Sequence, residues 1–416
     1  MLKRLHIEGF KSIRSATVDL GTVNVFIGAN GSGKSNVLEA LGVLGATLFG
    51  AVDAEPLKYR GVRPGLPTLY KTSFRGAVIP RIIKLQASSV GAEYRVGLEN
   101  PIDKPERRWK IQSESLSESE VQILGRSLNG CVVSSRSGKT TITPDGTESA
   151  VKTALQQQTP DDARSARDLV SRITDYGIYA PSTNTLRGLG QDVAKSPLGL
   201  SGSGLAIAVR DLLPVWRHPD SVFDLDSILE LIDWAESFSI VAPEQATVSP
   251  AVNVGRAVLR FTDRYMASKR KTLSAYDASE GALYVLFLVA LASHPDSPSL
   301  FAVDNFDHAL HPRLASRLMS LVSDGLSQME TRQMLLTTHN PLVLDGLDLR
   351  DDRVRLFAVE RARARENDTA GHRLVEGETL VRRIILTPQL LEQVQQGWSL
   401  SRLWVMGRIG GIPEGL

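Results

Sequence analysis

The chain has 416 residues, of which 42% are hydrophobic and 23% are charged, which is enough apolar material for one large domain or two ordinary ones. Because the formal net charge is only +2, the composition excludes a protein that attracts nucleic acid through its overall charge, so any DNA contact must come from a local patch. A single cysteine cannot form an internal disulfide, the longest apolar run (281–292) is too short to span a bilayer, and residues 1–10 lack the apolar core of a signal peptide. We therefore expect a cytoplasmic protein without a membrane partner.

The first strong motif follows an apolar run at residues 23–27, which predicts a buried parallel strand. Residues 28–35 then read Gly-Ala-Asn-Gly-Ser-Gly-Lys-Ser and fit the phosphate-binding loop pattern G-x-x-x-x-G-K-[ST]. In such a loop the glycines let backbone N–H groups face phosphate oxygens, Lys34 reaches the outer phosphates and Ser35 holds Mg²⁺. The candidate nucleotide-binding residues are Asn30, Gly31, Ser32, Gly33, Lys34, Ser35 and Asn36.

A helix is expected directly after this loop, because apolar residues recur at helical spacing from 37 to 48 and Gly50 is a plausible stop. Its N-terminus would face the bound anion.

The middle of the chain carries no motif for a reaction, but its patterns predict two kinds of structure. Segments 81–90, 93–100, 108–115 and 130–146 suggest short antiparallel strands, with a turn at 144–146. From about residue 160 the spacing becomes helical, as at 205–216 and 223–238, and no heptad pattern is long enough for a coiled coil. A long polar loop is expected at 178–204, where Arg187 is a candidate interface or DNA contact and a mobile surface loop is the alternative.

Two basic clusters, at 264–271 and 353–366, have two interpretations: a solvated face, or contact with the DNA backbone. Few aromatic residues lie near them, so stacking on single strands has little support. Near the C-terminus, residues 398–406 form a short amphipathic stretch that either docks onto the chain's own core or binds a partner.

Between these clusters, Ser279, Glu280 and Gly281 open an apolar helix that ends before Pro295. A serine and a glycine at a helix N-terminus can bind an anion, whereas an ordinary N-cap is the alternative.

Two further strands are expected at 300–303 and 334–337, and each is followed by a polar residue with a possible role. Asp304 stands at the end of the first strand, where a carboxylate can hold Mg²⁺ through water. His339 follows the second strand and could touch a γ-phosphate. A lone histidine is usually structural, but its spacing from Asp304 favours a functional role.

Taken together, these motifs resemble those of the ABC-type ATPase heads of the SMC, RecF and OLD group. "GANGSGKSN" resembles the Walker A motif of that group, "SEG" its signature motif, "LFAVDN" its Walker B motif, "NFDHALHP" its D-loop and "TTHNP" its switch histidine. The opening "LKRLHIEGFKSI" is similar to the first strand and turn of these heads, and Gln191 is a candidate for the Q-loop residue.

The fold that this resemblance implies is α/β: a P-loop sheet flanked by helices, with an antiparallel β part and an inserted, mainly helical arm. The expected domains are an N-terminal ATPase lobe at 1–155, the inserted arm at 156–245, a C-terminal ATPase lobe at 246–375 and a tail at 376–416.

The resemblance also implies a site that needs ATP and Mg²⁺. A homodimer or higher oligomer would close around two ATP molecules, each held by Lys34, Ser35 and Asp304 of one head, with Ser35 and Asp304 on the metal. Ser279 and Gly281 of the other head would close over the γ-phosphate.

Asn305 departs from the family pattern D-E-P-E, because the chain reads Asp304-Asn305-Phe306-Asp307. A carboxylate can take a proton from attacking water and an amide cannot, and the loss of such a base lowers the rate by about 10²–10⁴-fold. We therefore expect slow ATP hydrolysis with Asn305, Asp307 and His339 as the catalytic candidates, while His308 or a partner could also supply a base.

The function that the resemblance implies is that of a sensor or scaffold in bacterial defence against phage or plasmids. The C-terminal part looks too short for a TOPRIM nuclease, so a nuclease or toxin effector is expected on a separate chain. The alternative is a RecF-like DNA-binding ATPase in DNA repair. A transporter head and a small-molecule P-loop kinase fit less well, because the first lacks a full L-S-G-G-Q signature here and the second needs neither Ser279 nor His339.

Overall fold

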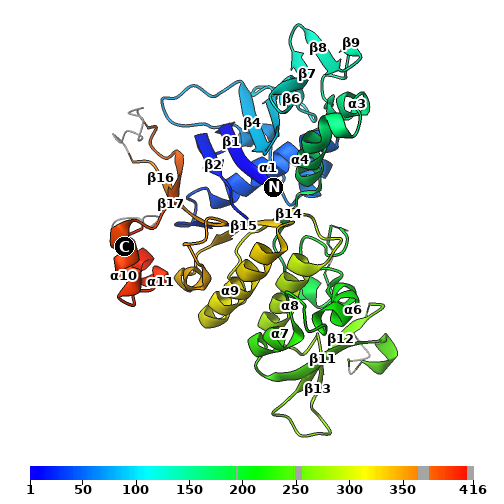
Figure 1. Cartoon of the computed structure of the whole chain (residues 1–416), viewed down its shortest axis with the longest axis vertical. Coiled ribbons are helices and arrows are strands. Elements are labelled where there is room, and N and C mark those ends of the chain that lie inside the picture. The colour runs from blue at the N-terminus through cyan, green and yellow to red at the C-terminus, as the bar shows by residue number, and fades with distance from the viewer. Residues whose placement is uncertain (191, 194, 247, 249–254, 364–373, 410–416) are drawn as a thin grey trace.

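The computed structural model describes residues 1–190, 192–193, 195–246, 248, 255–363 and 374–409 (Figure 1). Gln191, the candidate Q-loop residue, lies outside the described residues. So do residues 364–366 at the end of the second basic cluster.

A six-stranded sheet forms the centre of the molecule, in the order β10-β14-β15-β3-β16-β17. Its strands are β3 (Val23–Ile27), β10 (Ile178–Tyr179), β14 (Leu300–Val303), β15 (Gln333–Thr338), β16 (Val354–Arg361) and β17 (Thr379–Ile384). All neighbours pair in parallel except β16 and β17. Every residue of β3, β14 and β15 is buried, which explains why these strands are mostly apolar and confirms the strands predicted there.

Helices cover both faces of this sheet. Phe26 packs in the same apolar cluster as α1 (Lys34–Phe49) and α4 (Arg164–Asp175), whereas its neighbours Val25 and Ile27 pack with α8 (Glu280–Ser293) and α9 (Pro312–Met329). The helices predicted after the phosphate-loop motif and at the signature motif are therefore confirmed.

A second sheet of eight antiparallel strands lies beyond α1, in the order β2-β1-β4-β5-β6-β7-β8-β9 (Figure 1). Its strands are β1 (Leu2–Phe10), β2 (Ile13–Asp19), β4 (Ile82–Ser89), β5 (Ala92–Glu99), β6 (Lys110–Glu118), β7 (Val121–Ser127), β8 (Gly130–Ser135) and β9 (Gly138–Ile142). The antiparallel strands predicted between residues 81 and 146 are confirmed. The sequence did not predict β7, whose burial pattern does not alternate cleanly.

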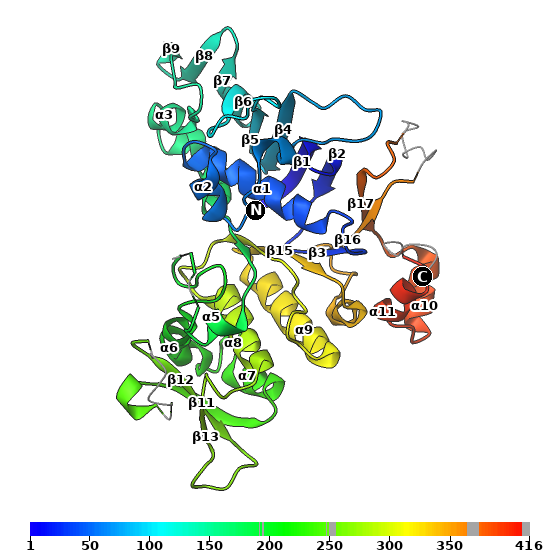
Figure 2. The same cartoon turned by 180° about the vertical axis from the view of Figure 1, so that it is seen from behind.

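On the other side of the central sheet, Figure 2 shows a mainly helical part that carries a three-stranded sheet, β11-β12-β13. Its elements are α5 (Thr183–Leu186), α6 (Leu205–Trp216), α7 (Leu225–Leu231), β11 (Ala235–Val241), β12 (Val258–Asp263) and β13 (Thr272–Ser274). The helical pattern predicted for 223–238 is wrong at its end, because the chain leaves the helix after Leu231 and β11 pairs with β12. The predicted loop at 178–204 is likewise interrupted by β10 and α5.

The segment 156–245 is connected to both sides of the molecule. Its α4 packs with α1, its β10 joins the central sheet and its β11 pairs with β12. The predicted domain bounds stay a prediction.

The C-terminal segment docks onto the chain's own core. Leu403 is fully buried, and Ser401 donates its backbone N–H and its hydroxyl to the carboxylate of Asp345 at 2.8 and 2.7 Å. These contacts join α11 (Leu400–Val405) to the 3₁₀ helix η4 (Pro341–Gly346), which follows His339. Docking is therefore the correct interpretation of this amphipathic stretch.

The remaining short elements are α2 (Ala54–Lys58), α3 (Val151–Gln156), α10 (Pro388–Gln395), η1 (Pro67–Tyr70), η2 (Asp161–Ala163) and η3 (Pro243–Gln245). Among all helices in the described ranges, none has the length and apolar content that crossing a membrane requires.

Candidate functional site

The loop after β3 wraps around the side chain of Lys34. The ammonium group donates to the carbonyl oxygens of Gly28 at 2.8 Å and Ala29 at 3.0 Å, and its nitrogen lies 3.3 Å from Nδ1 of His339. The parallel pairing of β3 with β15 brings Lys34 and His339 together, because both follow the carboxyl ends of neighbouring strands.

Two glycines of this loop are required by the backbone. Gly28 has φ +152° and a Cβ there would lie 2.1 Å from the carbonyl oxygen of Val359. Gly33 has φ +110° and a Cβ there would lie 2.3 Å from Oγ1 of Thr379. Any larger residue at either position would have to displace the loop or the strands beside it.

Residues that are distant in the sequence form hydrogen bonds with the phosphate-binding loop and with the first turn of the helix after it. Thr379 on β17 donates its hydroxyl to the carbonyl of Ser32 at 2.7 Å, and Arg361 on β16 donates to the carbonyl of Gly31 at 2.9 Å. Asn36 donates to the hydroxyl of Ser12 at 2.7 Å. Sequence reasoning missed Ser12, Arg361 and Thr379. Arg361 and Thr379 contact the loop across more than 300 residues, and no local pattern indicates such a contact.

The tip of the loop is open. Asn30 and Gly31 are exposed, whereas Oγ of Ser32 is buried and has no hydrogen-bond partner among the described residues. A buried hydroxyl without a partner is unusual, and a bound ligand is one way to satisfy it.

Ser35 and Asp304 meet beneath the loop. The Ser35 hydroxyl lies 3.0 Å from each carboxylate oxygen of Asp304. The carboxylate also accepts the hydroxyl of Thr337 at 2.5 Å, and the backbone N–H of Asp304 donates to the carbonyl of Tyr179 at 2.9 Å. A hydroxyl beside a carboxylate offers the hard oxygen ligands that Mg²⁺ prefers, and Mg²⁺ often takes only one or two protein ligands together with phosphate oxygens. The part of the chain that the structure describes holds no cluster of three or more metal-ligating His, Cys, Asp or Glu side chains.

Asn305 is exposed and adopts a left-handed backbone with φ +59°. Its N–H donates to the hydroxyl oxygen of Thr337 at 2.9 Å, and its carbonyl accepts the hydroxyl of Tyr284 at 3.2 Å. Asparagine adopts this conformation more readily than most other residues. The backbone of the turn is therefore one reason for asparagine at this position, apart from any chemical role.

Asp307 lies on the far side of the same turn, against the end of β15. One of its carboxylate oxygens accepts the hydroxyl of Thr338 at 2.7 Å and the backbone N–H of His339 at 3.3 Å. Thr337 therefore holds Asp304, and the next threonine holds Asp307.

The two basic groups of the site are both shifted toward their neutral forms. Burial lowers the pKa of Lys34 to about 8, although the carboxylates of Asp304 and Asp307 oppose this change. Burial and the charge of Lys34 also lower the pKa of His339. An anion that arrived here would favour the charged form of both groups.

The signature residues lie apart from this group. Ser279 is the exposed N-cap of α8, and its Oγ accepts the N–H of Ala282 at 3.4 Å and the indole N–H of Trp234 at 3.2 Å. A Cβ at Gly281 would make only ordinary contacts, the nearest at 3.4 Å from the carbonyl oxygen of Ala309. Within the described residues, no hydrogen bond joins Ser279 or Gly281 to the group around Lys34.

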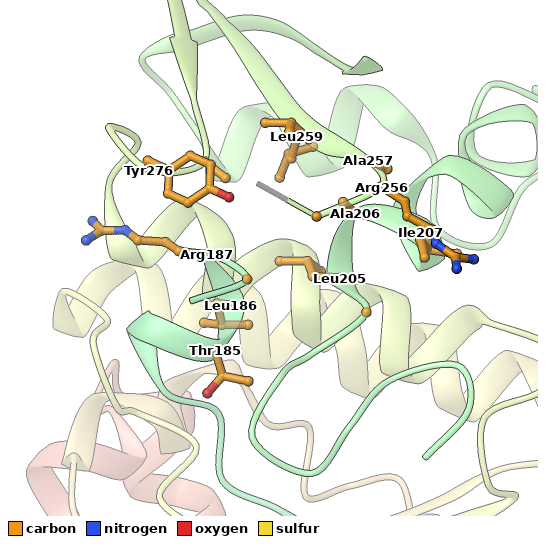
Figure 3. A pocket seen from close by; sticks show the side chains of 15 residues that line it. Thr185, Leu186, Arg187, Leu205, Ala206, Ile207, Arg256, Ala257, Leu259 and Tyr276 are labelled. Carbon is orange, nitrogen blue, oxygen red and sulfur yellow. The ribbon is translucent and has the colours of Figure 1, made fainter. Parts of the chain in front are cut away.

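Arg187, the candidate interface residue, braces the signature turn by donating to the carbonyl of Ala278 at 3.2 Å. It also stands at the rim of a small cavity of about 140 Å³. Figure 3 shows Leu205, Leu259 and Tyr276 around this cavity, while the guanidinium groups of Arg187 and Arg256 point away from it.

Two ATPase family models match the chain. One is described as "AAA domain, putative AbiEii toxin, Type IV TA system" and matches residues 162–345, and the other is described as "AAA ATPase domain" and matches residues 1–74. The first range contains Ser279, Asp304 and His339, and the second contains the loop around Lys34.

Two curated relatives share a short segment with the chain. The "DNA replication and repair protein RecF" of Shewanella loihica is 51% identical over 45 residues, and the protein of the same description from Shewanella piezotolerans is 53% identical over 45 residues. Each match covers 11% of this chain and only 12% of the relative's length.

Among solved structures, three SMC heads match the chain over most of its length. An SMC head bound to the C-winged helix domain of ScpA has a TM-score of 0.49 at 14% identity, covering 94% of this chain and 99% of the other. The head from Thermotoga maritima has a TM-score of 0.41 at 14% identity (92% and 98% covered), and the Pyrococcus furiosus head has 0.46 at 15% identity (95% and 99% covered).

The phosphate-loop sequence and the residues that meet at the sheet edge agree with the two ATPase family models, so the chain is similar to ATPases of this kind over residues 1–74 and 162–345. Over a segment of 45 residues it is also similar to RecF.

Proposed function

We propose that the chain is one head of a homodimer that closes around two molecules of ATP, each with Mg²⁺. The observation that carries this proposal is a separation: Lys34, Asp304 and His339 gather at one sheet edge, while Ser279 stands exposed on α8 without a hydrogen bond to them among the described residues. A serine at an exposed helix N-terminus, apart from its own nucleotide site, is suited to close over the nucleotide of a second copy.

The chain's own residues fit such a ligand. The unpartnered hydroxyl of Ser32 and the loop without Cβ atoms at Gly28 and Gly33 leave backbone and side-chain donors for phosphate oxygens. Lys34 would bind the β- and γ-phosphates and His339 would contact the γ-phosphate. Ser35 and Asp304 would hold Mg²⁺, which supplies positive charge against the phosphates when bound.

Turnover is proposed to be slow because of Asn305. Its amide can orient a water molecule but cannot remove a proton from it. Asp307 is the other carboxylate of the turn, yet Thr338 and His339 already donate to one of its oxygens. In the free protein, burial and the charge of Lys34 lower the pKa of His339, which favours the neutral imidazole that can accept a proton.

In the cell, we propose a sensor or scaffold in bacterial defence that controls a separate nuclease or toxin. The description of the matching family model, which names a toxin of a type IV toxin–antitoxin system, supports this direction. Affinity purification from the native host, with ATP and without it, tests the proposal: an effector chain that co-elutes only in one condition supports it, and the chain eluting alone in both conditions contradicts it.

The second candidate is a DNA-binding repair ATPase, favoured by the RecF matches and by the hairpin loop between β12 and β13. Lys269 and Arg270 at the tip of that loop are exposed, whereas Lys271 is paired with Glu236 at 3.1 Å. Replacing Lys269 and Arg270 by alanine should weaken duplex binding and reduce the slope of log K against log salt by about 2.

The matched control for that experiment replaces Lys104 and Arg107, two exposed cations in the loop between β5 and β6. Equal losses in both double variants would indicate only a general charge effect. Absence of measurable duplex binding by the native chain would exclude this candidate.

The homodimer itself is tested by titrating ATP calorimetrically and by measuring the molar mass with and without ATP. Binding together with a doubling of mass supports the proposal. Nucleotide binding by a chain that stays monomeric at micromolar concentration would contradict the dimer and leave the nucleotide site standing.

A further inference from the structure

Trp234 lies in the turn between α7 and β11, and its position is fixed by packing. Its ring packs against Phe261 with centroids 5.3 Å apart, and its carbonyl accepts the backbone N–H of Arg264 at 3.0 Å. Phe261 belongs to β12 and Arg264 follows its last residue, so the end of this strand contacts both the ring and the backbone of Trp234.

The indole N–H points at the signature serine. Nε1 of Trp234 donates to Oγ of Ser279 at 3.2 Å, and Ala282 donates its N–H to the same oxygen at 3.4 Å. A hydroxyl oxygen accepts two hydrogen bonds and donates one, and neither an indole N–H nor an amide N–H can accept a proton. Both acceptor positions of Ser279 are therefore occupied.

The remaining proton of Ser279 has to point in a third direction. Within the described residues, Ser279 donates no hydrogen bond, and the residue is exposed. The arrangement turns a hydroxyl that could accept or donate into one that can only donate. Such a group matches an acceptor, and an oxyanion is the strongest acceptor available to it.

We propose that Trp234 is a positioning residue that fixes the Ser279 hydroxyl as a hydrogen-bond donor toward the γ-phosphate held by a second copy of the chain. This inference rests on the proposed ATP-closed dimer and adds to it the side chain that orients the closing group. Trp234 itself touches no part of the nucleotide in this account.

The chain offers a matched control at the other end of the same helix. Trp216 donates its indole N–H to the hydroxyl of Ser293 at 3.2 Å, near the C-terminus of α8. Trp216→Phe and Trp234→Phe therefore remove the same kind of hydrogen bond from the same helix, and only the second removes it at the signature end.

The test measures ATP-dependent self-association of both variants by sedimentation, together with the affinity of the monomer for a fluorescent ATP analogue. We expect Trp234→Phe to weaken association about tenfold or more, because the loss acts at both composite sites of a symmetric dimer. Nucleotide affinity of the monomer should stay unchanged, and Trp216→Phe should leave both quantities unchanged.

The hydrogen bond is also visible directly in the ¹H–¹⁵N spectrum of the indole groups. The Trp234 signal, assigned by its loss in Trp234→Phe, should move in Ser279→Ala, while the Trp216 signal stays in place. If the chemical shift of the Trp234 indole group is the same in the native chain and in Ser279→Ala, the inference is overturned.

The outcomes separate this inference from the proposed function. A native chain that does not associate with ATP would refute the dimer. A native chain that does associate, with Trp234→Phe associating equally well or both tryptophan variants failing alike, would refute the role of Trp234 and leave the dimer intact.

Discussion

The hydroxyl of Thr337 donates to a carboxylate oxygen of Asp304 at 2.5 Å, and the same hydroxyl oxygen accepts the backbone N–H of Asn305 at 2.9 Å. One buried threonine on β15 thus sets the position of the proposed magnesium ligand and of the residue that follows it. This relationship links the strand that leads to His339 with the strand that leads to Asp304.

Replacing Thr337 by valine keeps its shape and removes this link. We expect weaker Mg²⁺-dependent nucleotide binding and a loss of about 1–3 kcal/mol in the free energy of unfolding, because Asp304 and the N–H of Asn305 lose a partner. A magnesium titration at fixed fluorescent nucleotide measures the first effect and urea denaturation the second. Thr338→Val is the matched control, since it releases Asp307 and should leave the magnesium dependence unchanged.

The pKa of Lys34 predicts how nucleotide affinity varies with pH. Only the ammonium form attracts phosphate, and in the free protein this form is lost as the pH rises through about 8. The contribution of Lys34 to the dissociation constant for ATP should therefore be level below that pH and rise above it by up to about tenfold per pH unit, because binding has to take up a proton. Lys34→Arg should abolish this rise, since arginine stays charged. A level profile in the native chain would show that Lys34 is charged throughout.

Asn305→Glu tests the origin of slow turnover. A carboxylate at this position could accept a proton from water, so the steady-state ATPase rate should rise at least about tenfold. Asn305→Gln has the same length without the charge and should not increase the rate. Both side chains tolerate the left-handed backbone less well than asparagine, so the pair also controls for strain. Equal rates in the native chain and Asn305→Glu would show that the asparagine does not limit turnover.

Replacing two glycines of the loop by alanine should destabilise the chain to different extents. Gly28→Ala should cost about 3 kcal/mol or more in the free energy of unfolding, because its Cβ would lie 2.1 Å from the carbonyl oxygen of Val359. Gly31→Ala has open space around the new Cβ and only a φ of +75° to oppose it, so a loss of about 1 kcal/mol is expected. Chemical denaturation of both variants measures the difference, and equal losses would contradict the crowding at Gly28.

The sequence predicted those parts of the site that lie within a few residues of a strand end. Lys34, Asp304 and His339 each come after a short, fully buried strand, and parallel strands bring their carboxyl ends together whatever the chain does between them. The signature helix could be predicted for the same reason, because Ser279 and the apolar run after it form a local pattern.

What the sequence could not reveal depends on contacts between distant segments. Thr379 supports the phosphate loop only because β17 pairs with β16, and neither strand has a spacing that points to residue 32. Trp234 reaches Ser279 only because the chain leaves its helix at Leu231 and turns into β11. Helical spacing continues past Leu231 in the sequence, and strand pairing with β12 overrides it.

Complementation between two inactive variants measures closure between subunits most directly. Lys34→Ala removes the phosphate-binding ammonium of one head, and Ser279→Arg blocks the closing serine of another, so each variant alone should hydrolyse almost no ATP. In an equal mixture, half of the dimers are mixed and each contains one intact composite site, so about a quarter of native turnover should return. Turnover that stays at the average of the two separate variants would contradict the account, because Ser279 would then not act on the nucleotide of its twin.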